Sequence, residues 1–340
     1  MDSDLLLPRP EGLYCPAGDF YIDPLYPVHR AVVTHAHGDH ARSGSGHYDV
    51  ALAGVGLMRE RLGAGSSIDA HAYGERFAMG DTVISLHPSG HVLGAAQIRI
   101  EGAGKVAVVS GDYKRDPDPT CAPFEPVPCD IFVTESTFGL PVYRWPHMSS
   151  VIDDMLAWLD ECKAQNVPAV LFCYALGKAQ RILAELARHT TRTVFLHGAM
   201  LRLVDVYREA GIRMLPTAPV SESARGRDFA GELIMAPPSA AGSPWMKRFS
   251  RASTGFASGW MRIRGARRRR GYDRGFVVSD HADWPGLVQS VRDSQAKRIY
   301  VTHGDGEALI RYLRDNGHDA RPLRELGGAM PDERSSEEGD

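Results

Sequence analysis

Three histidines and one aspartate lie close together near the start of the chain, at His35, His37, Asp39 and His40. They directly follow the apolar residues 31–33, as loop residues follow a short buried strand. Imidazole and carboxylate groups are ligands that suit Zn²⁺ and similar divalent ions. His35 and His37 could share one ion, and Asp39 and His40 could reach a second ion nearby. A chance cluster on a polar loop is the alternative, but the position after an apolar strand favours a metal site.

Further ligands are expected where other strands end. His91, Asp112 and His303 each follow an apolar run or adjoin a glycine, whose backbone can approach an ion closely. One arrangement uses all seven side chains: a first ion held by His35, His37 and His91, a second held by Asp39, His40 and His303, and Asp112 bridging the two. Two cations that share a water molecule would lower the pKa of that water to near neutrality. The sequence therefore predicts a two-metal hydrolytic centre.

A carboxylate and a histidine at two other strand ends form a candidate acid/base pair. Glu135 lies in the sequence TESTFG and His281 in the sequence SDHADW. Cleavage of a phosphodiester often needs a proton donor for the leaving oxygen, and a carboxylate that orients an imidazole raises its pKa and suits it to this task. Glu135 could instead cap a helix or lie in a turn, and His281 could compete with His303 for the second ion. His87 is expected to support the site without binding metal.

Length and composition are those of a large soluble protein. The 340 residues are enough for two domains, 43% of them are hydrophobic, 24% are charged, and the net charge is −3. The acidic N-terminus lacks the pattern of a signal peptide, and no apolar run reaches the length of a membrane span. The five cysteines are odd in number and form no CxxC pair, which favours free thiols in a reducing compartment. We therefore expect a cytoplasmic protein that does not contact membranes.

The distribution of strands and helices indicates an inserted domain. Up to about residue 140, short β-rich runs alternate with turns, and strands are expected at 31–33, 82–86, 96–100, 106–109 and 131–134. From about residue 148, helical and strand patterns alternate as in a βαβ-type domain. The first pattern returns with a strand at 276–278 and helices at 284–292 and 307–316. The predicted boundaries are 1–145 and 273–327 for the first domain, 146–272 for the inserted domain and 328–340 for a disordered tail.

Seven short motifs resemble those of the metallo-β-lactamase fold, and within it the β-CASP branch that processes nucleic acids. In chain order they are THAHGDH, SGHVLGAAQ, SGDY, TESTFG, ALGKAQ, SDHADW and VTHG, and they span residues 31 to about 305. The resemblance implies an α/β fold, an αββα sandwich with an inserted β-CASP domain, and a pair of Zn or Mn ions on the seven ligands above. It also implies catalytic roles for Asp39, Asp112, Glu135 and His281. Asp23, in the sequence YIDP, resembles the first motif of the family, which supports the metal loop from behind.

The resemblance also bears on the substrate. The segments LYCPAGDFYIDP, TCAPFEPVPCD, TESTFGLPVYRW and FASGWM resemble a bacterial group of DNA-ligase-associated exonucleases. This implies a DNA exonuclease of DNA repair that attacks with metal-activated hydroxide, with a DNA ligase and a helicase as functional partners. However, DNA-processing members of the family usually carry valine where His303 stands, and RNA-processing members carry histidine. A ribonuclease with the same chemistry is therefore the alternative to a DNA exonuclease.

A basic segment with interleaved aromatic residues could contact the substrate. Residues 247–274 contain ten Lys or Arg side chains and one acidic residue, Asp273. The aromatic residues are Trp245, Phe249, Phe256 and Trp260. Phosphate neutralisation by arginine and stacking on aromatic rings both support single-strand binding, whereas a solvated loop with core aromatics is the alternative. We assign nucleic-acid contact to Lys178, in the ALGKAQ motif, and to Arg267, Arg268, Arg269 and Arg270.

Two other classes of function fit the sequence less well. A hydrolase of thioesters or lactams can use the same ligands, but the chain between Asp112 and His303 is long enough for a whole inserted domain. The basic segment would also have no purpose in such an enzyme. A non-catalytic scaffold would be expected to have lost ligands, whereas every expected ligand position is filled here. We therefore expect a phosphodiester hydrolase that acts on nucleic acid, with DNA favoured over RNA.

Overall fold

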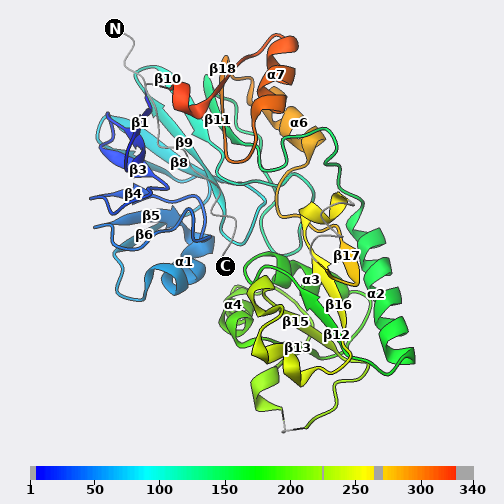
Figure 1. The fold of residues 1–340 in the computed structure, drawn as a ribbon. Coiled ribbons are helices and arrows are strands. Elements are labelled where there is room, and N and C mark those ends of the chain that lie inside the picture. Colours follow the sequence, from blue (N-terminus) through cyan, green and yellow to red (C-terminus); the bar gives the residue numbers. More distant parts are fainter. Residues whose placement is uncertain (1–4, 224–225, 264–270, 327–340) are drawn as a thin grey trace. The chain divides into compact units, whose positions relative to one another are not determined.

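The computed structural model describes residues 5–223, 226–263 and 271–326, which divide into two compact units (Figure 1). The first unit contains the described residues up to Tyr143 and those from His281 onward. The second unit contains the described residues of Arg144–Asp280, so it is one stretch of chain set between two parts of the first. No helix in the described ranges has the length and apolar character needed to cross a lipid bilayer. The chain is a mixed α/β protein, as predicted.

The first unit contains two sheets. The first sheet pairs its strands in chain order: β1 (Leu7–Arg9), β2 (Gly12–Cys15), β3 (Phe20–Ile22), β4 (Ala31–Val32), β5 (Tyr48–Ala51) and β6 (Ile68–His71). The second sheet consists of β7 (Arg76–Met79), β8 (Thr82–Pro88), β9 (Ala96–Gly102), β10 (Lys105–Val109), β11 (Ile131–Glu135), β18 (Arg298–Thr302) and β19 (Asp319–Pro322). Its order is β19-β18-β11-β10-β9-β8-β7, and the neighbours from β10 to β19 run parallel.

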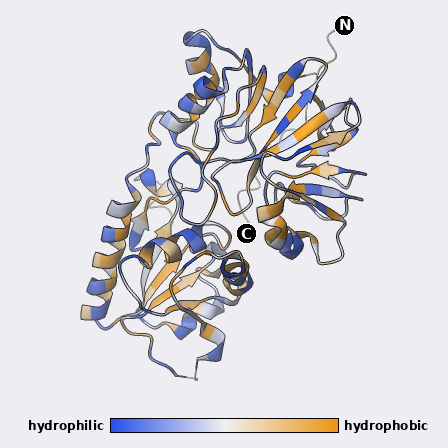
Figure 2. Cartoon of the chain, turned by 180° about the vertical axis from the view of Figure 1, so that it is seen from behind, coloured by the Kyte–Doolittle hydropathy of each residue, from blue (hydrophilic) through white to orange (hydrophobic). Residues whose placement is uncertain are grey.

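Alternating side chains of the second sheet pack on its two faces. Val109 and Val133 lie in a core shared with residues of the first sheet, such as Ile22. Val108 and Phe132 point the other way and pack against helices α6 (Trp284–Ser294) and α7 (Glu307–Asp315). Both faces are thus covered, and Figure 2 shows hydrophobic residues concentrated on these strands. Helix α1 (Val55–Leu62) lies beside β5 of the first sheet.

The second unit contains a parallel sheet with helices. Its strands are β12 (Ala169–Phe172), β13 (Val194–Leu196), β14 (Thr217–Pro219), β15 (Leu233–Ala236), β16 (Ser253–Ala257) and β17 (Arg274–Phe276), in the order β14-β13-β15-β12-β16-β17. Its helices are α2 (Met148–Ala164), α3 (Lys178–Leu186) and α4 (Gly198–Glu209). Hydrophobic clusters on both faces bury these strands, as is usual for parallel sheets. Short 3-10 helices of the two units occupy Leu52–Gly54, Val220–Glu222, Pro238–Ala240, Pro244–Arg248, Gly259–Arg262 and Leu323–Glu325.

The predicted strands and helices are found within two residues of their expected ends, but one belongs to a different unit. The strand expected at 276–278 is β17, which pairs in parallel with β16 of the second unit. This pairing makes β17 part of the parallel sheet of the second unit. The return to the first unit therefore occurs between Asp280 and His281, not at 272/273. The earlier boundary lies between Tyr143 and Arg144, close to the expected 145/146. The expected tail at 328–340 lies outside the described residues.

The start of helix α3 is tied to the end of the second unit by a buried ion pair. The ammonium of Lys178 lies 2.6 Å from the carboxylate of Asp280, and both side chains are buried. One turn further along the helix, Arg181 donates a hydrogen bond to the carbonyl of Ser279 at 2.8 Å. Lys178 was expected to contact nucleic acid, but the structure places it inside the second unit with its charge already compensated. A structural role for Lys178 follows from this position.

Replacing Lys178 alone tests that structural role. Lys178→Met leaves the Asp280 carboxylate buried without its partner, which is expected to destabilise the protein by about 3–5 kcal/mol. The paired variant Lys178→Met/Asp280→Leu is expected to recover most of this loss, because an apolar pair can replace a buried ion pair. Urea unfolding followed by circular dichroism measures both effects, and Lys163→Met, at an exposed lysine of the same unit, is the control. Unchanged stability with weaker nucleic-acid binding would instead support the expected substrate contact.

Candidate metal centre

The loop after β4 carries the first group of histidines and is held by Asp23. The Asp23 carboxylate accepts hydrogen bonds from the backbone N–H of Thr34 at 2.8 Å and from its hydroxyl at 2.6 Å. The same carboxylate lies 2.7 Å from Nδ1 of His40. Because a partner on Nδ1 determines which ring nitrogen faces inward, Asp23 directs Nε2 of His40 toward the centre of the site. Asp23 therefore lies where a residue that supports the ligands from behind is expected.

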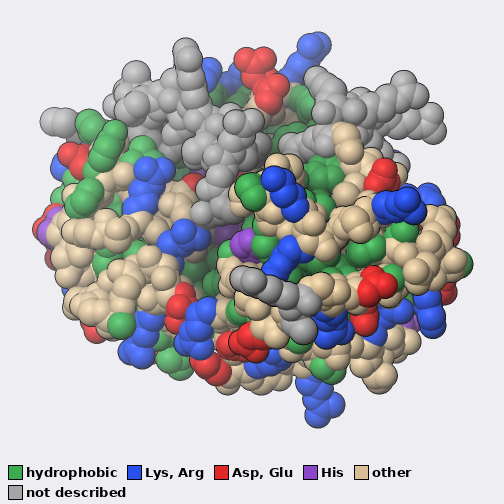
Figure 3. Space-filling model, turned by 60° about the horizontal axis from the view of Figure 1, so that its bottom comes forward, with side chains coloured by type: hydrophobic (Ala, Val, Ile, Leu, Met, Phe, Trp, Pro, Cys, Tyr) green, Lys and Arg blue, Asp and Glu red, His purple; other side chains and the backbone are tan. Residues whose placement is uncertain are grey.

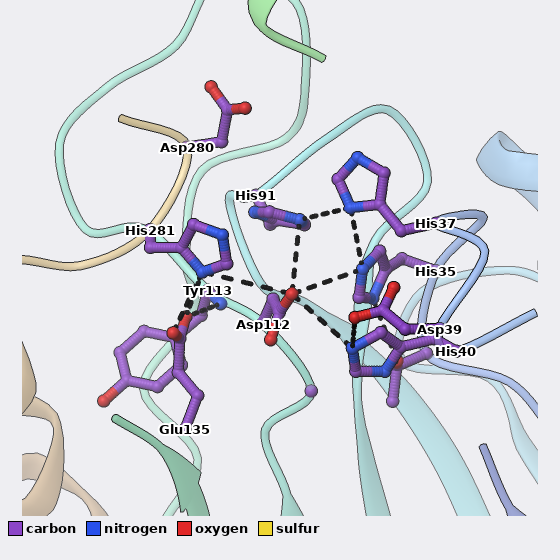
Figure 4. Close-up of polar contacts among 12 residues, drawn as sticks. His35, His37, Asp39, His40, His91, Asp112, Tyr113, Glu135, Asp280 and His281 are labelled. Carbon is purple, nitrogen blue, oxygen red and sulfur yellow. Dashed lines mark hydrogen bonds and ion pairs between the residues drawn. The ribbon is translucent and has the colours of Figure 1, made fainter. Parts of the chain in front are cut away.

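Three ring nitrogens converge in a first cluster (Figure 4). Nδ1 of His37 lies 3.1 Å from Nε2 of His35 and 3.0 Å from Nε2 of His91. Oδ2 of Asp112 lies 3.5 Å from the His35 nitrogen and 3.7 Å from the His91 nitrogen. All four possible ligand atoms lie within 4.8 Å of one another, which is compatible with a common ion. His91 comes from the loop between β8 and β9, so the fold brings two distant segments together here.

A second cluster shares Asp112 with the first. Nε2 of His40 lies 3.5 Å from Oδ2 of Asp112 and 3.6 Å from Oδ2 of Asp39. The ring of His303 stacks on that of His40 with centroids 4.9 Å apart, and His40, Asp112 and His303 offer ligand atoms within 4.8 Å of one another. The side chain of Asp39 is 48% exposed, so it lies at the open side of this cluster. One carboxylate oxygen thus adjoins both clusters, as a bridging ligand would.

Two buried atoms at the centre of the site fit a cation. Within the described part of the chain, Oδ1 of Asp112 and Nε2 of His40 have no hydrogen-bond partner. Buried polar atoms are almost always satisfied, so exceptions that face a group of histidines indicate metal binding. Imidazole nitrogens and a carboxylate are also the donor set that Zn²⁺ and Mn²⁺ accept. The side chains present therefore suit divalent ions, which agrees with the expectation from sequence.

Burial and neighbouring charges shift the pKa values of three groups in the two clusters. Burial holds the pKa of His35 well below its ordinary value. Burial also lowers the pKa of His40, but the carboxylates of Asp112 and Asp23 outweigh it and raise this pKa well above the ordinary value. Burial raises the pKa of Asp112, but the charges of His40 and His281 outweigh it and hold that pKa well below its ordinary value. Asp112 is therefore ionised and His35 neutral, which are the forms that bind metal, whereas the raised pKa of His40 means that this ring must release a proton when it binds an ion.

The expected acid/base pair is assembled beside the two clusters. Glu135, at the end of β11, is fully buried and accepts a hydrogen bond from the backbone N–H of Tyr113 at 2.7 Å. Its carboxylate also lies 2.9 Å from Nδ1 of His281, and that nitrogen is 3.9 Å from Oδ2 of Asp112. A carboxylate partner makes Nδ1 of His281 the donor, so Nε2 is the nitrogen able to exchange a proton with a reacting group. The anchoring N–H of Tyr113 is a backbone group that no side-chain pattern in the sequence reveals.

His281 and His303 occupy different places, which bears on their competition for the second ion. His281 contacts Glu135, whereas His303 stacks on His40. His303 thus lies with the second cluster and His281 beside Glu135, although Asp112, Glu135 and His281 also offer ligand atoms within 4.8 Å of one another. His87 contacts Ser85 at 3.0 Å and Glu125 at 3.0 Å, apart from the two clusters.

In the described part of the basic segment, two aromatic rings lie in the core and the basic side chains are exposed. Phe249 and Phe256 are buried in the hydrophobic core of the second unit. Arg274 pairs with Glu161, and Arg248 donates a hydrogen bond to the carbonyl of Val220 at 3.2 Å. Arg267, Arg268, Arg269 and Arg270 lie outside the described residues. On the face drawn in Figure 3, basic and acidic side chains are interspersed. The two buried aromatic rings therefore favour the alternative of core aromatics at these positions.

Comparisons with known proteins relate most of the chain to a curated protein and shorter parts of it to several others. The chain is 31% identical over 326 residues to a protein named probable DNA ligase from Opitutus terrae, which covers 92% of this chain and 30% of that protein. It is 31% identical over 130 residues to endoribonuclease YSH1 of Gibberella zeae, covering 37% of this chain and 15% of that protein. An RNase J-like protein of Methanocaldococcus jannaschii is 24% identical over 142 residues, 41% of this chain and 32% of that protein. The chain thus spans about a third or less of the length of these relatives.

A solved structure shares the fold. A protein of unknown function from Enterococcus faecalis V583 superposes with a TM-score of 0.60 at 13% identity, over 88% of this chain and 80% of that one. No protein-family model matches the chain. The curated relatives nevertheless support the metallo-β-lactamase and β-CASP nuclease resemblance of the sequence motifs.

Metal removal tests the two clusters directly. Treatment with EDTA is expected to lower the melting temperature, and Zn²⁺ or Mn²⁺ to restore it, because an ion bound only by the folded state adds about 2.7 kcal/mol at a hundredfold excess over its Kd. Asp112→Asn is expected to lose most of this recovery, since Asp112 adjoins both clusters. Differential scanning calorimetry makes the measurement, with His87→Gln as the control for loss of a histidine nearby. Equal recovery in Asp112→Asn and the unmodified protein would contradict the shared-ligand role.

Proposed function

We propose that the chain is a metal-dependent phosphodiesterase of the metallo-β-lactamase β-CASP family that acts on nucleic acid. The observation that carries this proposal is one buried carboxylate, Asp112, shared by two histidine clusters with the pair Glu135–His281 beside them. The first ion, Zn or Mn, would be held by His35, His37 and His91, the second by Asp39, His40 and His303, and Asp112 would bind both. The first unit would then be the metallo-β-lactamase domain and the second unit the inserted β-CASP domain.

The residues of the site divide the work of phosphodiester hydrolysis. When bound, two divalent ions activate water and neutralise the charge that develops on phosphate. Asp23 and the backbone of Tyr113 hold His40 and Glu135 in place, so the charged groups are oriented before substrate arrives. His281 gives a proton from Nε2 to the leaving oxygen, and Glu135 stabilises the imidazolium form from the side of Nδ1. This mechanism needs both the metal ligands and the pair Glu135–His281, and all of these residues belong to the first unit.

For the substrate, we propose DNA and an exonuclease mode in DNA repair. The likeness to a protein named DNA ligase extends over 92% of this chain, whereas the likeness to endoribonuclease YSH1 of Gibberella zeae covers 37%. The relative named probable DNA ligase also supports a functional association with a DNA ligase. The resemblance of the motifs further suggests a helicase as a functional partner. We propose that the protein acts in the cytoplasm. His303 favours the ribonuclease alternative, because RNA-processing members of the family carry histidine at this position.

A paired digest separates the two substrates. DNA and RNA strands of one sequence, labelled at either end, are incubated with purified protein and Mn²⁺ or Zn²⁺. We expect stepwise shortening of DNA with RNA left intact, and no cleavage by Asp112→Ala, which controls for contaminating nucleases. Preferential cleavage of RNA would contradict the DNA proposal in favour of the ribonuclease, and cleavage of neither would contradict the nuclease proposal.

The role of His281 is tested by changing the leaving group. His281→Ala is expected to slow cleavage of the natural phosphodiester by about 10²–10⁴-fold, the usual contribution of general acid catalysis. The loss should be much smaller on bis(p-nitrophenyl) phosphate, because p-nitrophenolate leaves without a proton. Glu135→Gln is expected to show the same pattern in a weaker form. Single-turnover rates on both substrates provide the comparison, and equal losses on the two would argue for a metal-binding or structural role.

A further inference from the structure

We infer that Ser136 is a positioning residue that holds His303 in the second cluster, an inference that rests on the metal-binding role proposed for that cluster. Ser136 directly follows Glu135 at the end of β11 and is fully buried. Sequence reasoning assigned it no role, because a serine after a strand is a common turn residue. Its contacts with the segment that carries His303 point to a specific function.

Ser136 continues the pairing of two strands beyond their ends. Strands β11 and β18 run parallel, and their last pair places Glu135 beside Thr302. At the next position the backbone N–H of Ser136 donates a hydrogen bond to the carbonyl of His303 at 3.1 Å. The hydroxyl of Ser136 also donates to the His303 carbonyl and lies 3.0 Å from the carbonyl of Thr302. Two donors of one residue therefore converge on the backbone of His303.

His303 needs such an anchor because its backbone is strained. Its φ is +50°, in the left-handed region that L-residues other than glycine rarely adopt and that costs about 1–2 kcal/mol. A residue in this conformation persists only when its surroundings determine it. The left-handed turn carries the imidazole of His303 to its stacked position on His40. Bonds from Ser136 to the His303 carbonyl are therefore suited to maintain both the turn and the position of the ring.

The space around Ser136 shows that the turn is built against it. A Cβ atom at Gly304, where φ is +75°, would lie 2.7 Å from the carbonyl oxygen of Ser136. A Cβ atom at Gly139 would lie 2.9 Å from the same oxygen, and one at Gly306 would lie 3.1 Å from the Ser136 hydroxyl. Glycine at 304 and 306 lets the backbone after His303 approach Ser136 closely, and Gly139 closes the turn that follows Ser136 itself.

The two clusters should therefore respond differently when the hydroxyl is removed. The first cluster draws its histidines from the loops after β4 and β8, whereas the hydroxyl of Ser136 donates to the segment of Thr302 and His303. The second cluster depends on His303. Loss of a residue that orients a ligand typically weakens metal binding by about 10–100-fold. We expect Ser136→Ala to weaken the second ion by this factor and to leave the first ion unchanged.

Metal titration of the full chain tests this inference without using enzymatic activity. Metal-free protein is titrated with Mn²⁺ and with Zn²⁺ by calorimetry, and bound Mn²⁺ is counted by electron paramagnetic resonance. The unmodified protein is expected to bind two ions, and Ser136→Ala to bind one normally and the other about 10–100-fold more weakly. His303→Ala is expected to have the same defect. The double variant should lose no more than His303→Ala alone, because both changes act on one ligand.

A matched serine controls for general damage to the core. Ser294 in α6 is also buried and donates its hydroxyl to a backbone carbonyl, that of Val291 at 2.7 Å. Ser294→Ala is expected to bind both ions like the unmodified protein. Normal affinity for both ions in Ser136→Ala, or equal weakening of both, would overturn the inference. If Ser136→Ala does not fold, Ser136→Cys, with its weaker donor, must show a smaller selective loss of the second ion, and normal binding would overturn the inference.

The proposed function and this inference can fail separately. If the unmodified protein binds two ions but cleaves no nucleic acid, the proposed nuclease function is contradicted. A selective loss of the second ion in Ser136→Ala would still support the role of Ser136. An active nuclease in which Ser136→Ala binds both ions normally would contradict only the role of Ser136.

Discussion

The buried carboxylate of Asp112 is the constraint on which the rest of the first unit depends. It is only 5% exposed, and its Oδ2 atom lies 3.5 to 3.9 Å from ring nitrogens of His35, His40, His91 and His281. An ionised carboxylate removed from water is costly unless opposite charges or hydrogen-bond donors surround it. Neighbouring imidazoles supply part of that compensation, and the divalent ions that we propose would supply the rest. The side chains that meet at Asp112 must therefore be brought to one point from several strands.

The parallel strands of the second sheet achieve this convergence. Strands β10, β11 and β18 are neighbours and run in the same direction, so their carboxyl ends lie at one edge of the sheet. Glu135 ends β11, and Asp112 and His303 come shortly after the ends of β10 and β18, which is where open α/β sheets carry their functional groups. Strand β4 adds His35 and His40 from the other sheet. Anchors such as Asp23 and, in our inference, Ser136 then orient individual rings within this frame.

Local patterns in the sequence point to the residues that the structure gathers around Asp112, because these residues come within a few positions of the ends of short apolar strands. Relationships between distant segments are not visible in the same way. The lysine of the ALGKAQ motif, Lys178, has the features of a phosphate contact, and only the fold shows its partner Asp280, 102 positions away. The sequence of β17 would suit a strand of either unit, and only its pairing with β16 shows that it belongs to the second unit. The bond from the Tyr113 backbone to Glu135 involves an N–H group that every residue except proline has.

The most direct test of this account is an anomalous diffraction experiment on crystals grown with Zn²⁺. Data collected on both sides of the zinc absorption edge locate each bound ion independently of any assumed ligand. We expect two anomalous peaks, both at a bonding distance of about 2.0–2.2 Å from the carboxylate oxygens of Asp112. One peak would adjoin His35, His37 and His91, and the other would adjoin His40 and His303. A single peak, or a second peak that does not touch Asp112, would contradict the shared carboxylate.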